Sequence, residues 1–237
     1  VPRERAPREA RGALVPESVA KLVKSGSTVC IEGDAGLAAG FPDAAYVEKG
    51  ATVAASREAV FSSADVILQV RSLASSRTAP PPDLSLVRKG QVLVGFLDPI
   101  GAPEGIQAVA DRGATAFAMD LIPRITRAQA MDALSSMATI IGYKAVLLAA
   151  DTTPRMFPML MTAGGTLAPA RVFIIGAGVA GLQAIATARR LGAVVEAYDV
   201  RPAVKEQIES LGAKFVELPL ETQAAQDQGG YAKAMDE

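Results

Sequence analysis

The sequence contains no histidine and only one cysteine among its 237 residues. Histidine is the side chain that most often exchanges a proton near neutral pH, and a dehydrogenase that oxidises an alcohol or an amine usually needs such a group. An enzyme built from this chain must therefore use Lys, Asp, Glu or Tyr, or catalyse a reaction without proton transfer. Cys30 has no second cysteine for an internal disulfide, and we expect it to be a buried structural thiol.

The chain also lacks an excess of charge and a long hydrophobic run. It has 24 basic and 25 acidic residues, which leaves no electrostatic basis for binding nucleic acid or an anionic membrane surface. The most apolar stretch, residues 137–150, is too short to span a bilayer and contains Lys144, so we expect neither a transmembrane nor a signal segment. Half of the residues are hydrophobic, which is typical of a globular chain with one large or two ordinary domains.

The first 120 residues alternate short helical and strand-like segments, with Gly or Pro at many of the joints. We predict helices at residues 16–24, 42–50, 57–64 and 103–112, and strands at residues 28–32, 51–55, 65–70, 91–97 and 114–119. This alternation predicts a parallel sheet covered by helices on both faces.

A second region begins with small and apolar residues throughout positions 126–150, which predict one helix of about 37 Å, long enough to bridge two domains. Strands at 171–175, 193–199 and 213–217 then alternate with helices at 180–191 and 203–211. The predicted fold is α/β, with two Rossmann-like doubly wound parallel-sheet domains (1–125 and 166–237) joined by a helix and loop (126–165). A complete dinucleotide-binding domain has two βαβαβ halves, so we expect the second domain to be incomplete and the chain to be part of a longer polypeptide.

A glycine-rich turn gives the clearest functional signal. The strand at 171–175 leads directly into Gly176, Gly178 and Gly181, which have the GxGxxG spacing of a dinucleotide-binding turn. Gly176 would permit the tight turn, Gly178 would let the backbone approach a pyrophosphate, and Gly181 would let the following helix pack closely. The N-terminus of that helix would bind the phosphates. Such turns also serve plain strand-to-helix packing, but the strands and helix around this one favour a cofactor site.

Asp199 ends the next strand, 18 residues after the last glycine, where an acidic residue accepts hydrogen bonds from ribose hydroxyls. Arg201 stands where an arginine sometimes accommodates the 2′-phosphate of NADP. Because the Asp199 carboxylate would repel that phosphate, we expect NAD(H) rather than NADP(H).

Polar side chains form a second candidate site near the start of the predicted long helix. Gln129, Asp132 and Ser136 fall at helical positions i, i+3 and i+7, with Ser135 at the edge of the same stripe. Arg124, just before this helix, would hold a ribose hydroxyl, a carboxamide or a phosphate. The stripe predicts either a polar wall of the cofactor cleft or a solvated helix face.

Other charged residues are weaker candidates for a functional site. Arg3, Arg5 and Arg11 would either bind a substrate carboxylate or be solvated near the terminus. Asp98 follows a strand and would either face a cleft or shape a turn with Pro99 and Gly101. We expect no metal site.

Taken together, these motifs resemble the NAD(H)-binding domain I of the alpha subunit of proton-translocating NAD(P) transhydrogenase. The resemblance covers nearly the whole chain, and its most specific segment is Ile122–Ser136. It implies that Arg124, Gln129, Asp132 and Ser135 line the nicotinamide end of the site and serve as the catalytic residues. The other cofactor contacts that it implies, beside the three glycines of the turn, are Ile125, Thr126, Val179, Asp199, Val200, Arg201, Gly230 and Tyr231, the last two in a loop that closes over the nucleotide.

This resemblance implies direct, Re/Si-specific hydride transfer between NADH on this chain and NADP(H) on a partner domain, coupled to proton movement across a membrane. Its partners would be the beta subunit or its NADP(H)-binding domain and a membrane-embedded proton channel domain, and the chain itself would form a homodimer. It would be cytoplasmic and peripheral to the membrane. Hydride transfer between two nicotinamides needs no proton at the reacting carbons, which agrees with the missing histidine.

Two alternatives stay open. Alanine dehydrogenase has the same fold, but it would be expected to carry a Lys and a His where this chain has Arg71-Ser72 and Asp98-Pro99. A non-catalytic NAD-binding module would bind NADH without transferring hydride.

Overall fold

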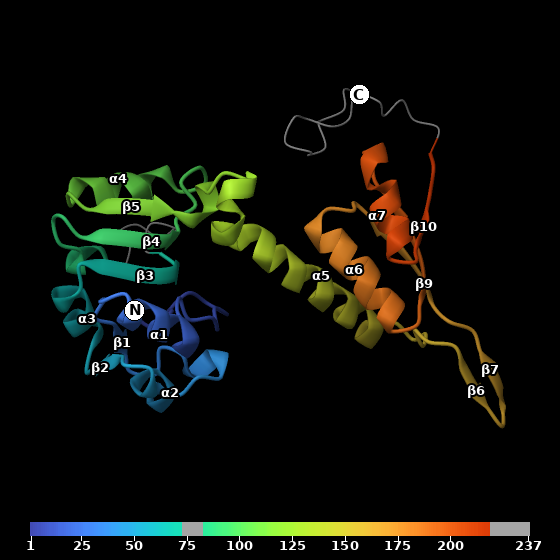
Figure 1. Cartoon of the computed structure of the whole chain (residues 1–237), viewed down its shortest axis with the longest axis horizontal. Coiled ribbons are helices and arrows are strands. Elements are labelled where there is room, and N and C mark those ends of the chain that lie inside the picture. Colours follow the sequence, from blue (N-terminus) through green and yellow to red (C-terminus); the bar gives the residue numbers. More distant parts are fainter. Residues whose placement is uncertain (73–82, 219–237) are drawn as a thin grey trace. The chain divides into compact units, whose positions relative to one another are not determined.

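The computed structural model describes residues 1–72 and 83–218 of the chain. These residues belong to two compact units, Val1–Ile122 and Pro123–Glu237, each of which contains parallel β-strands and its own hydrophobic core (Figure 1). The long helix and the glycine-rich turn both belong to the second unit.

In the first unit, helices and parallel strands alternate along the chain. The strands form two sheets, β1 (Cys30–Glu32) with β2 (Thr52–Ala54), and β3 (Val66–Arg71), β4 (Val92–Phe96) and β5 (Thr115–Ala118) in the order β3-β4-β5. The α-helices are α1 (Pro16–Lys24), α2 (Asp43–Glu48), α3 (Arg57–Ser63) and α4 (Pro103–Asp111), and short 3-10 turns are η1 (Leu37–Ala39), η3 (Leu84–Leu86) and η4 (Met119–Leu121). Each predicted helix and strand of this region lies within two residues of an observed one, because Pro and Gly punctuate the ends.

Local sequence explains several of these ends. Pro16 and Pro103 occupy the first turns of α1 and α4, where the missing N–H costs no hydrogen bond. Ser56 caps α3 by accepting a hydrogen bond from the Ala59 N–H. Cys30 is only partly buried, contrary to the prediction, because it begins β1 at the margin of the core cluster around Phe61.

In the second unit, the strands β8 (Arg171–Ile175), β9 (Val194–Tyr198) and β10 (Lys214–Phe215) form a parallel sheet in the order β10-β9-β8. The chain between these strands forms α6 (Val179–Arg190), the 3-10 turn η6 (Pro202–Val204) and α7 (Lys205–Ser210). Ile185 of α6, Val195 of β9 and Ile208 of α7 are almost fully buried in one core with Val146 of helix α5 (Ala133–Thr152). This core fixes α5 and α6 against each other and thereby positions the glycine-rich turn.

The predicted long helix is wrong at its start. Residues Thr126–Met131 form a 3-10 helix, η5, and α5 begins only at Ala133. The break falls at Asp132, whose ψ of 82° is not helical and whose side chain caps α5. A capping side chain competes with continued backbone helix, which explains why helical periodicity did not reveal the break.

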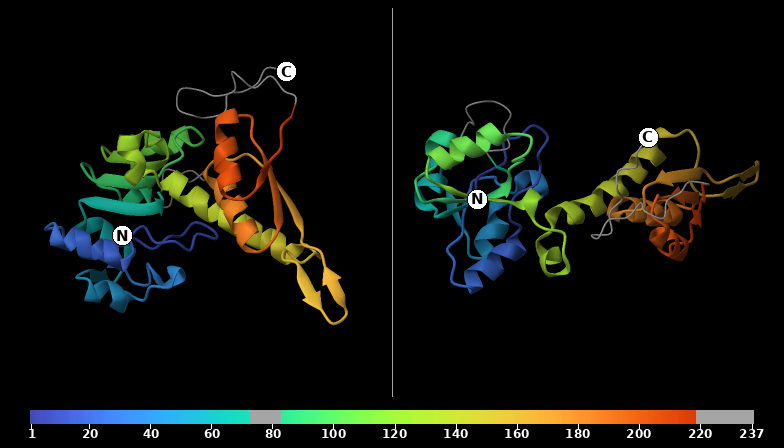
Figure 2. Two further views of the ribbon diagram at one scale, coloured as in Figure 1. Left: turned by 45° about the vertical axis from the view of Figure 1, so that its right-hand side comes forward. Right: turned by 90° about the horizontal axis from the view of Figure 1, so that it is seen from above.

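A further expectation for this region is also wrong. The segment after α5, expected to be a loop, contains the antiparallel hairpin β6 (Leu160–Thr162) and β7 (Gly165–Leu167), which projects from the unit (Figures 1 and 2). The apolar run, expected to be too short for a bilayer, belongs to the 20-residue α5, which by length and composition alone could cross one. Core helices can meet the same criteria, and α5 packs against α6.

Candidate functional site

The glycine-rich turn between β8 and α6 has a backbone that requires glycine at two positions. Gly176 has φ +91°, in the left-handed region, and its N–H donates to the Tyr198 carbonyl at 2.8 Å. A Cβ on Gly181 would lie 1.8 Å from the Gly176 carbonyl oxygen, so any side chain there would push α6 away from the turn. Around Gly178, by contrast, the space within 4 Å of an added Cβ holds no described atom, which leaves the backbone open to a ligand.

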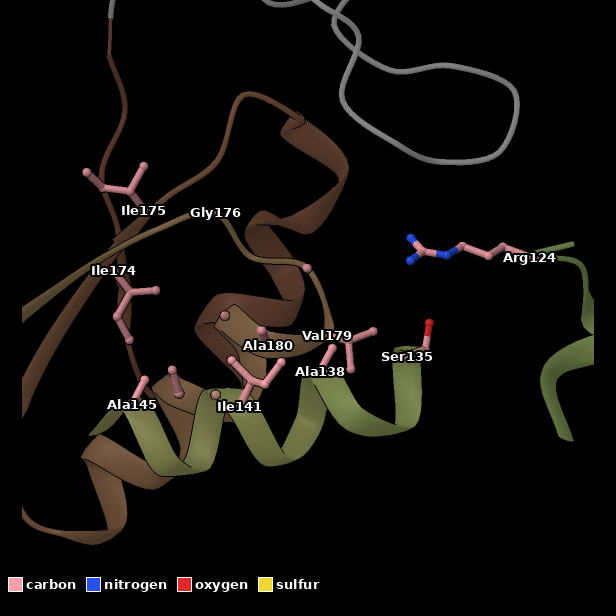
Figure 3. Close-up of a pocket in the computed structure, with 14 residues that line it drawn as sticks. Arg124, Ser135, Ala138, Ile141, Ala145, Ile174, Ile175, Gly176, Val179 and Ala180 are labelled. Carbon is pink, nitrogen blue, oxygen red and sulfur yellow. The ribbon is translucent and has the colours of Figure 1, made fainter. Parts of the chain in front are cut away.

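A cavity of about 480 Å³ lies beside this turn, within the second unit (Figure 3). One wall comes from the segment around η5 and from α5, and the other from β8, the turn and the start of α6. The lining residues are Arg124, Ser135, Ala138, Ile141, Gly142, Ala145, Ile174, Ile175, Gly176, Gly178, Val179, Ala180, Gly181 and Ala184. The N-terminus of a 12-residue helix, with its unpaired N–H groups and positive dipole end, therefore faces a cavity with mainly apolar walls.

Arg124 and Ser135 provide the polar side chains among these lining residues. Figure 3 shows the Arg124 guanidinium reaching toward the turn and the Ser135 hydroxyl at the start of α5. The cavity thus combines one cation and one hydroxyl with an apolar floor. This combination suits a molecule with a flat apolar ring, an amide group and a phosphate.

Asp132 determines how the Ser135 hydroxyl is presented. Asp132 Oδ1 accepts from the Ser135 N–H at 2.9 Å, and Oδ2 accepts from the Ser135 hydroxyl at 2.6 Å. These two hydrogen bonds, with the nearby charge of Arg124, lower the pKa of Asp132. Because an ionised carboxylate only accepts, the Ser135 proton is committed to Asp132, and the oxygen offers lone pairs to other groups.

The predicted polar stripe does not exist as one helix face. Gln129 is exposed on η5, before the break, whereas Ser135 and Ser136 lie after it on α5. Ser136 donates to the Asp132 carbonyl at 3.0 Å. Of the predicted nicotinamide contacts, Arg124 and Ser135 line the cavity in the described structure, and Gln129 and Asp132 do not. The predicted cofactor contacts Ile125 and Thr126 do not line it either.

Asp199, at the end of β9, is tied to the glycine-rich turn and to Arg201. It accepts from the Ala177 N–H at 2.7 Å, from the Arg201 N–H at 2.8 Å, and from Arg201 Nε at 2.9 Å. Burial opposes the charge on this carboxylate, but the hydrogen bonds from Arg201 and Ala177 prevail and lower the pKa of Asp199. Neither Asp199 nor the adjacent Val200 is among the residues that line the cavity, and Gly230 and Tyr231 lie outside the described residues.

Gly142 is a cavity residue that sequence reasoning missed. A Cβ on this residue would lie 2.1 Å from the Ala180 carbonyl oxygen, so α5 and α6 cross here with their backbones in close approach. Small residues at 138, 142 and 145, on one side of α5, were the signal in the sequence.

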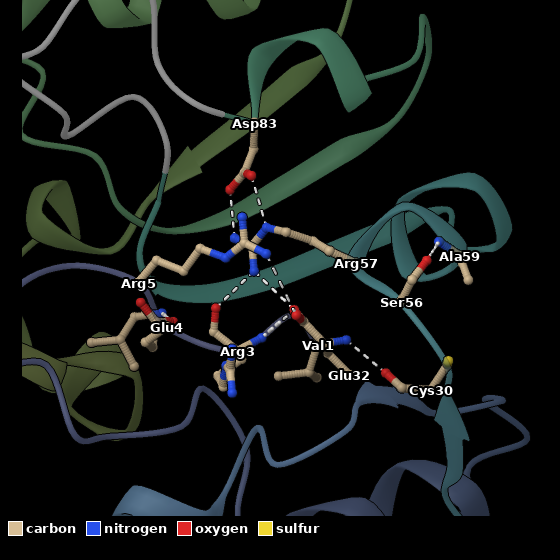
Figure 4. Close-up of polar contacts among 11 residues, drawn as sticks. Val1, Arg3, Glu4, Arg5, Cys30, Glu32, Ser56, Arg57, Ala59 and Asp83 are labelled. Atoms are coloured by element: carbon tan, nitrogen blue, oxygen red, sulfur yellow. Dashed lines mark hydrogen bonds and ion pairs between the residues drawn. The ribbon is translucent and has the colours of Figure 1, made fainter.

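Arg5 and Arg11, near the N-terminus, are engaged by acids of the first unit. Arg11 donates to Glu9 at 2.7 Å through Nε, and Arg5 lies 3.8 Å from Glu32. The same Glu32 accepts from the Arg3 N–H and from the buried Arg57, which also bonds Asp83 and the Arg3 carbonyl (Figure 4). This arrangement is typical of a structural ion-pair network.

Asp98 follows β4 in a turn. Its φ is +48°, and its carboxylate accepts from the Gly101 N–H at 3.2 Å. The Asp98 N–H donates to Asp120 at 2.6 Å, which joins the ends of two neighbouring strands. This geometry agrees with the turn-shaping alternative.

Comparison with known proteins gives matches along nearly the whole chain. Residues 1–141 match the family described as "Alanine dehydrogenase/PNT, N-terminal domain", and residues 145–236 match the corresponding C-terminal domain. The chain is 47% identical, over its whole length, to the first portion of NAD(P) transhydrogenase subunit alpha of Rhodospirillum rubrum, and it spans 62% of that protein. It is 30% identical to alanine dehydrogenase of Bacillus subtilis, over 89% of the chain and 54% of the relative.

Solved structures give the same picture. A transhydrogenase from Sinorhizobium meliloti matches with a TM-score of 0.86 and 51% identity, over 92% of this chain and 61% of that one. An L-alanine dehydrogenase matches with a TM-score of 0.78 and 29% identity, over 91% and 59% of the two chains. The predicted α/β fold with Rossmann-like parallel sheets is thereby confirmed.

Proposed function

The chain belongs to the alanine dehydrogenase/PNT family, and we propose that it is the NAD(H)-binding component of a proton-translocating transhydrogenase. The observation that carries the proposal is the cavity in which a glycine-rich turn and helix N-terminus face Arg124 and Ser135. The transhydrogenase alpha subunit of Rhodospirillum rubrum is also more similar to it, at 47% identity, than is the alanine dehydrogenase of Bacillus subtilis, at 30%.

The residues of the second unit fit a bound NAD(H). The left-handed Gly176, the open backbone at Gly178 and the N-terminus of α6 at Val179 suit a pyrophosphate. Asp199, with Val200 and Arg201 after it, would hold the adenosine ribose, and its negative charge would disfavour a 2′-phosphate. Ile125 and Thr126 would add backbone contacts near Arg124, and Gly230 and Tyr231 would close over the nucleotide.

Arg124 and Ser135 would orient the nicotinamide. Arg124 can only donate hydrogen bonds, whereas the Ser135 oxygen, its proton held by Asp132, accepts them. A carboxamide has one accepting oxygen and a donating NH₂ group, so this pair complements it. Asp132 would act through Ser135, and Gln129 would face the ring from η5.

When bound, NADH supplies a hydride from its nicotinamide C4 to the corresponding carbon of NADP⁺ on a partner domain. The chain's own residues then have to fix the ring and exclude water, for which the apolar Ile141 and Val179 at the cavity are suited. Such a role needs no general base, in agreement with the absence of histidine.

The proposed partners are the beta subunit, or the domain in it that binds NADP(H), and a membrane-embedded proton channel domain. The chain would lie on the cytoplasmic side, peripheral to the membrane. Its Re/Si-specific hydride transfer would be coupled to proton translocation by the membrane-embedded domain.

We also propose a homodimer, which the β6–β7 hairpin supports. The side chains of Met159, Met161 and Leu167 are between 51% and 78% exposed, and an isolated two-stranded hairpin is marginally stable in water. A second copy would cover this apolar projection.

Alanine dehydrogenation is the second candidate, favoured by the TM-score of 0.78 to an L-alanine dehydrogenase. Against it, Asp98 shapes a turn where that enzyme would be expected to have a His, and Arg71 Nε is 3.8 Å from Glu9. NADH oxidation that depends on pyruvate and ammonia would establish this candidate.

The deciding experiment mixes the full-length protein with an NADP(H)-binding transhydrogenase domain and follows reduction of an NAD analogue by NADPH. Arg124→Ala should lower this rate at least about tenfold, as expected for loss of a charged hydrogen bond. Arg127→Ala is the matched control, since Arg127 lies on the same segment but does not line the cavity. Equal rates for both variants would contradict the role of Arg124. A parent that transfers no hydride here and does not oxidise NADH with pyruvate and ammonia would be a non-catalytic NAD-binding module.

The role of Gln129 needs its own variant in the same assay. Gln129→Asn shortens the side chain by one methylene and keeps the amide, so a slower transfer would support its contact with the ring. Unchanged turnover would count against that contact.

A further inference from the structure

Gly142 lies where the two walls of the cavity come closest, at the crossing of α5 and α6. Its missing side chain lets the α5 backbone approach the Ala180 carbonyl, and a Cβ at this position would be only 2.1 Å from that oxygen. Gly142 is buried within α5 and also lines the cavity. The crossing therefore sets the distance between the wall that carries Ser135 and the wall that carries the glycine-rich turn.

We infer that Gly142 is a positioning residue for hydride transfer, an inference that rests on the proposed function. The contact that a side chain would meet is a backbone carbonyl of α6, which cannot rotate away as a flexible side chain can. To restore a separation of 3.0 Å, the two helices must move apart by about 1 Å. Interiors packed at crystal-like density transmit such a shift instead of absorbing it.

The shift would reach the nicotinamide end of the cavity. Ser135 precedes Gly142 by seven residues on the same helix, about 10 Å along its axis. Asp132, which holds the Ser135 proton, caps that same helix and would move with it. The pyrophosphate-binding turn belongs to the other wall and would keep its geometry through Asp199 and Ala177.

We therefore expect Gly142→Ala to change the rate of hydride transfer much more than the affinity for NADH. Most of the NADH contacts on the α6 side are retained in Gly142→Ala, so the dissociation constant for NADH should change less than about threefold. Displacement of a reacting ring by about 1 Å can cost on the order of a hundredfold in rate. We expect kcat for NADPH-driven reduction of the NAD analogue to fall between about tenfold and a hundredfold, with little change in KM.

Two control variants of the full-length protein separate this role from a loss of stability. Val146→Ala removes packing one turn further along the same crossing without adding an atom between the backbones, and Val146 is buried in the core. Ala149→Ser adds one non-hydrogen atom to an exposed position of α5. Both should transfer hydride at the parental rate per folded molecule, with the folded fraction taken from urea unfolding.

Each outcome bears on the inference. Parental kcat in Gly142→Ala would overturn it, as would a loss of transfer in Val146→Ala that matches the loss in Gly142→Ala. Failure of Gly142→Ala to fold would assign Gly142 to folding alone and would also overturn it. If the parent itself binds NADH but transfers no hydride, the proposed function fails instead, whatever the variants do.

Discussion

Asp132 and Ser135 form two hydrogen bonds that serve the fold and the site together. The N–H of Ser135 donates to Asp132 Oδ1 at 2.9 Å, and its hydroxyl donates to Oδ2 at 2.6 Å. The first bond caps α5 and the second orients a hydroxyl at the cavity. The same carboxylate therefore starts the helix and fixes a polar group of the proposed nicotinamide site.

Substitution of Asp132 should separate these two effects. Asp132→Ala loses the cap, and we expect the free energy of unfolding to fall by about 1 kcal/mol. Asp132→Asn retains a capping oxygen but no longer guarantees that Ser135 acts as an acceptor, so transfer should fall while stability stays within about 0.5 kcal/mol of the parent. Urea unfolding and the transfer assay measure the two quantities. Equal rates of hydride transfer in Asp132→Asn and the parent would show that Asp132 does not orient the Ser135 hydroxyl for transfer.

Substitution of Gly181 should affect the nucleotide site through the backbone. Gly181→Ala brings a Cβ within 1.8 Å of the Gly176 oxygen, so the turn must shift. NADH should bind at least about tenfold more weakly, and stability should fall by about 1–3 kcal/mol, as for overpacking. Gly164→Ala is the control, because its nearest described contact is Thr162 Oγ1 at 3.7 Å. Equal NADH affinities in a fluorescence titration would contradict the assigned position of the pyrophosphate.

Removal of the Asp199 charge should weaken the preference for NADH over NADPH. In Asp199→Asn the repulsion of a 2′-phosphate is gone and Arg201 loses its ion pair with Asp199, so the ratio of the two dissociation constants should move toward NADPH by at least about tenfold. Asp199→Asn with Arg201→Ala should lose most of this gain. An unchanged ratio in isothermal titration would show that Asp199 does not select the nucleotide.

Acid should remove the stability that Asp199 provides. Its pKa is lower in the folded than in the unfolded chain, so its contribution is present above the unfolded pKa of about 3.9 and is lost as pH falls through the folded pKa. The urea midpoint of the parent should therefore exceed that of Asp199→Asn above pH 5, and the difference should shrink below pH 4. A difference that stayed constant from pH 7 to pH 3 would contradict this linkage.

A charge on the hairpin should disrupt the proposed homodimer. Met161 is 78% exposed on β6, and Met161→Asp would place a carboxylate in an apolar contact between two copies. Sedimentation velocity should show a dimer for the parent and a monomer for the variant, with unchanged circular dichroism. Gln207→Asp, on the exposed side of α7, should stay dimeric. A monomeric parent would exclude the homodimer.

Much of the molecule could be predicted from local sequence, because its determinants lie within a few residues of each other. Pro16 and Pro103 begin helices, and the glycines of the GxGxxG turn have the conformations and contacts that strand-to-helix turns require. The break at Asp132 was not predictable from periodicity, since helix-favouring residues such as Ala, Gln and Met precede it and the outcome depends on one side chain that caps α5.

The sequence by itself determined the α/β class, the place of the dinucleotide turn and the acid at the end of the next strand, because strand alternation, glycine spacing and strand ends are short-range properties. Only the tertiary structure decided which polar residues share the cavity, since the wall that carries Arg124 and Ser135 faces the glycine-rich turn through the packing of α5 on α6. It also decided that Asp199 is bound to the turn and that Gly142 must have no side chain. Both depend on contacts between segments more than 20 residues apart, whose partners cannot be read from the local sequence.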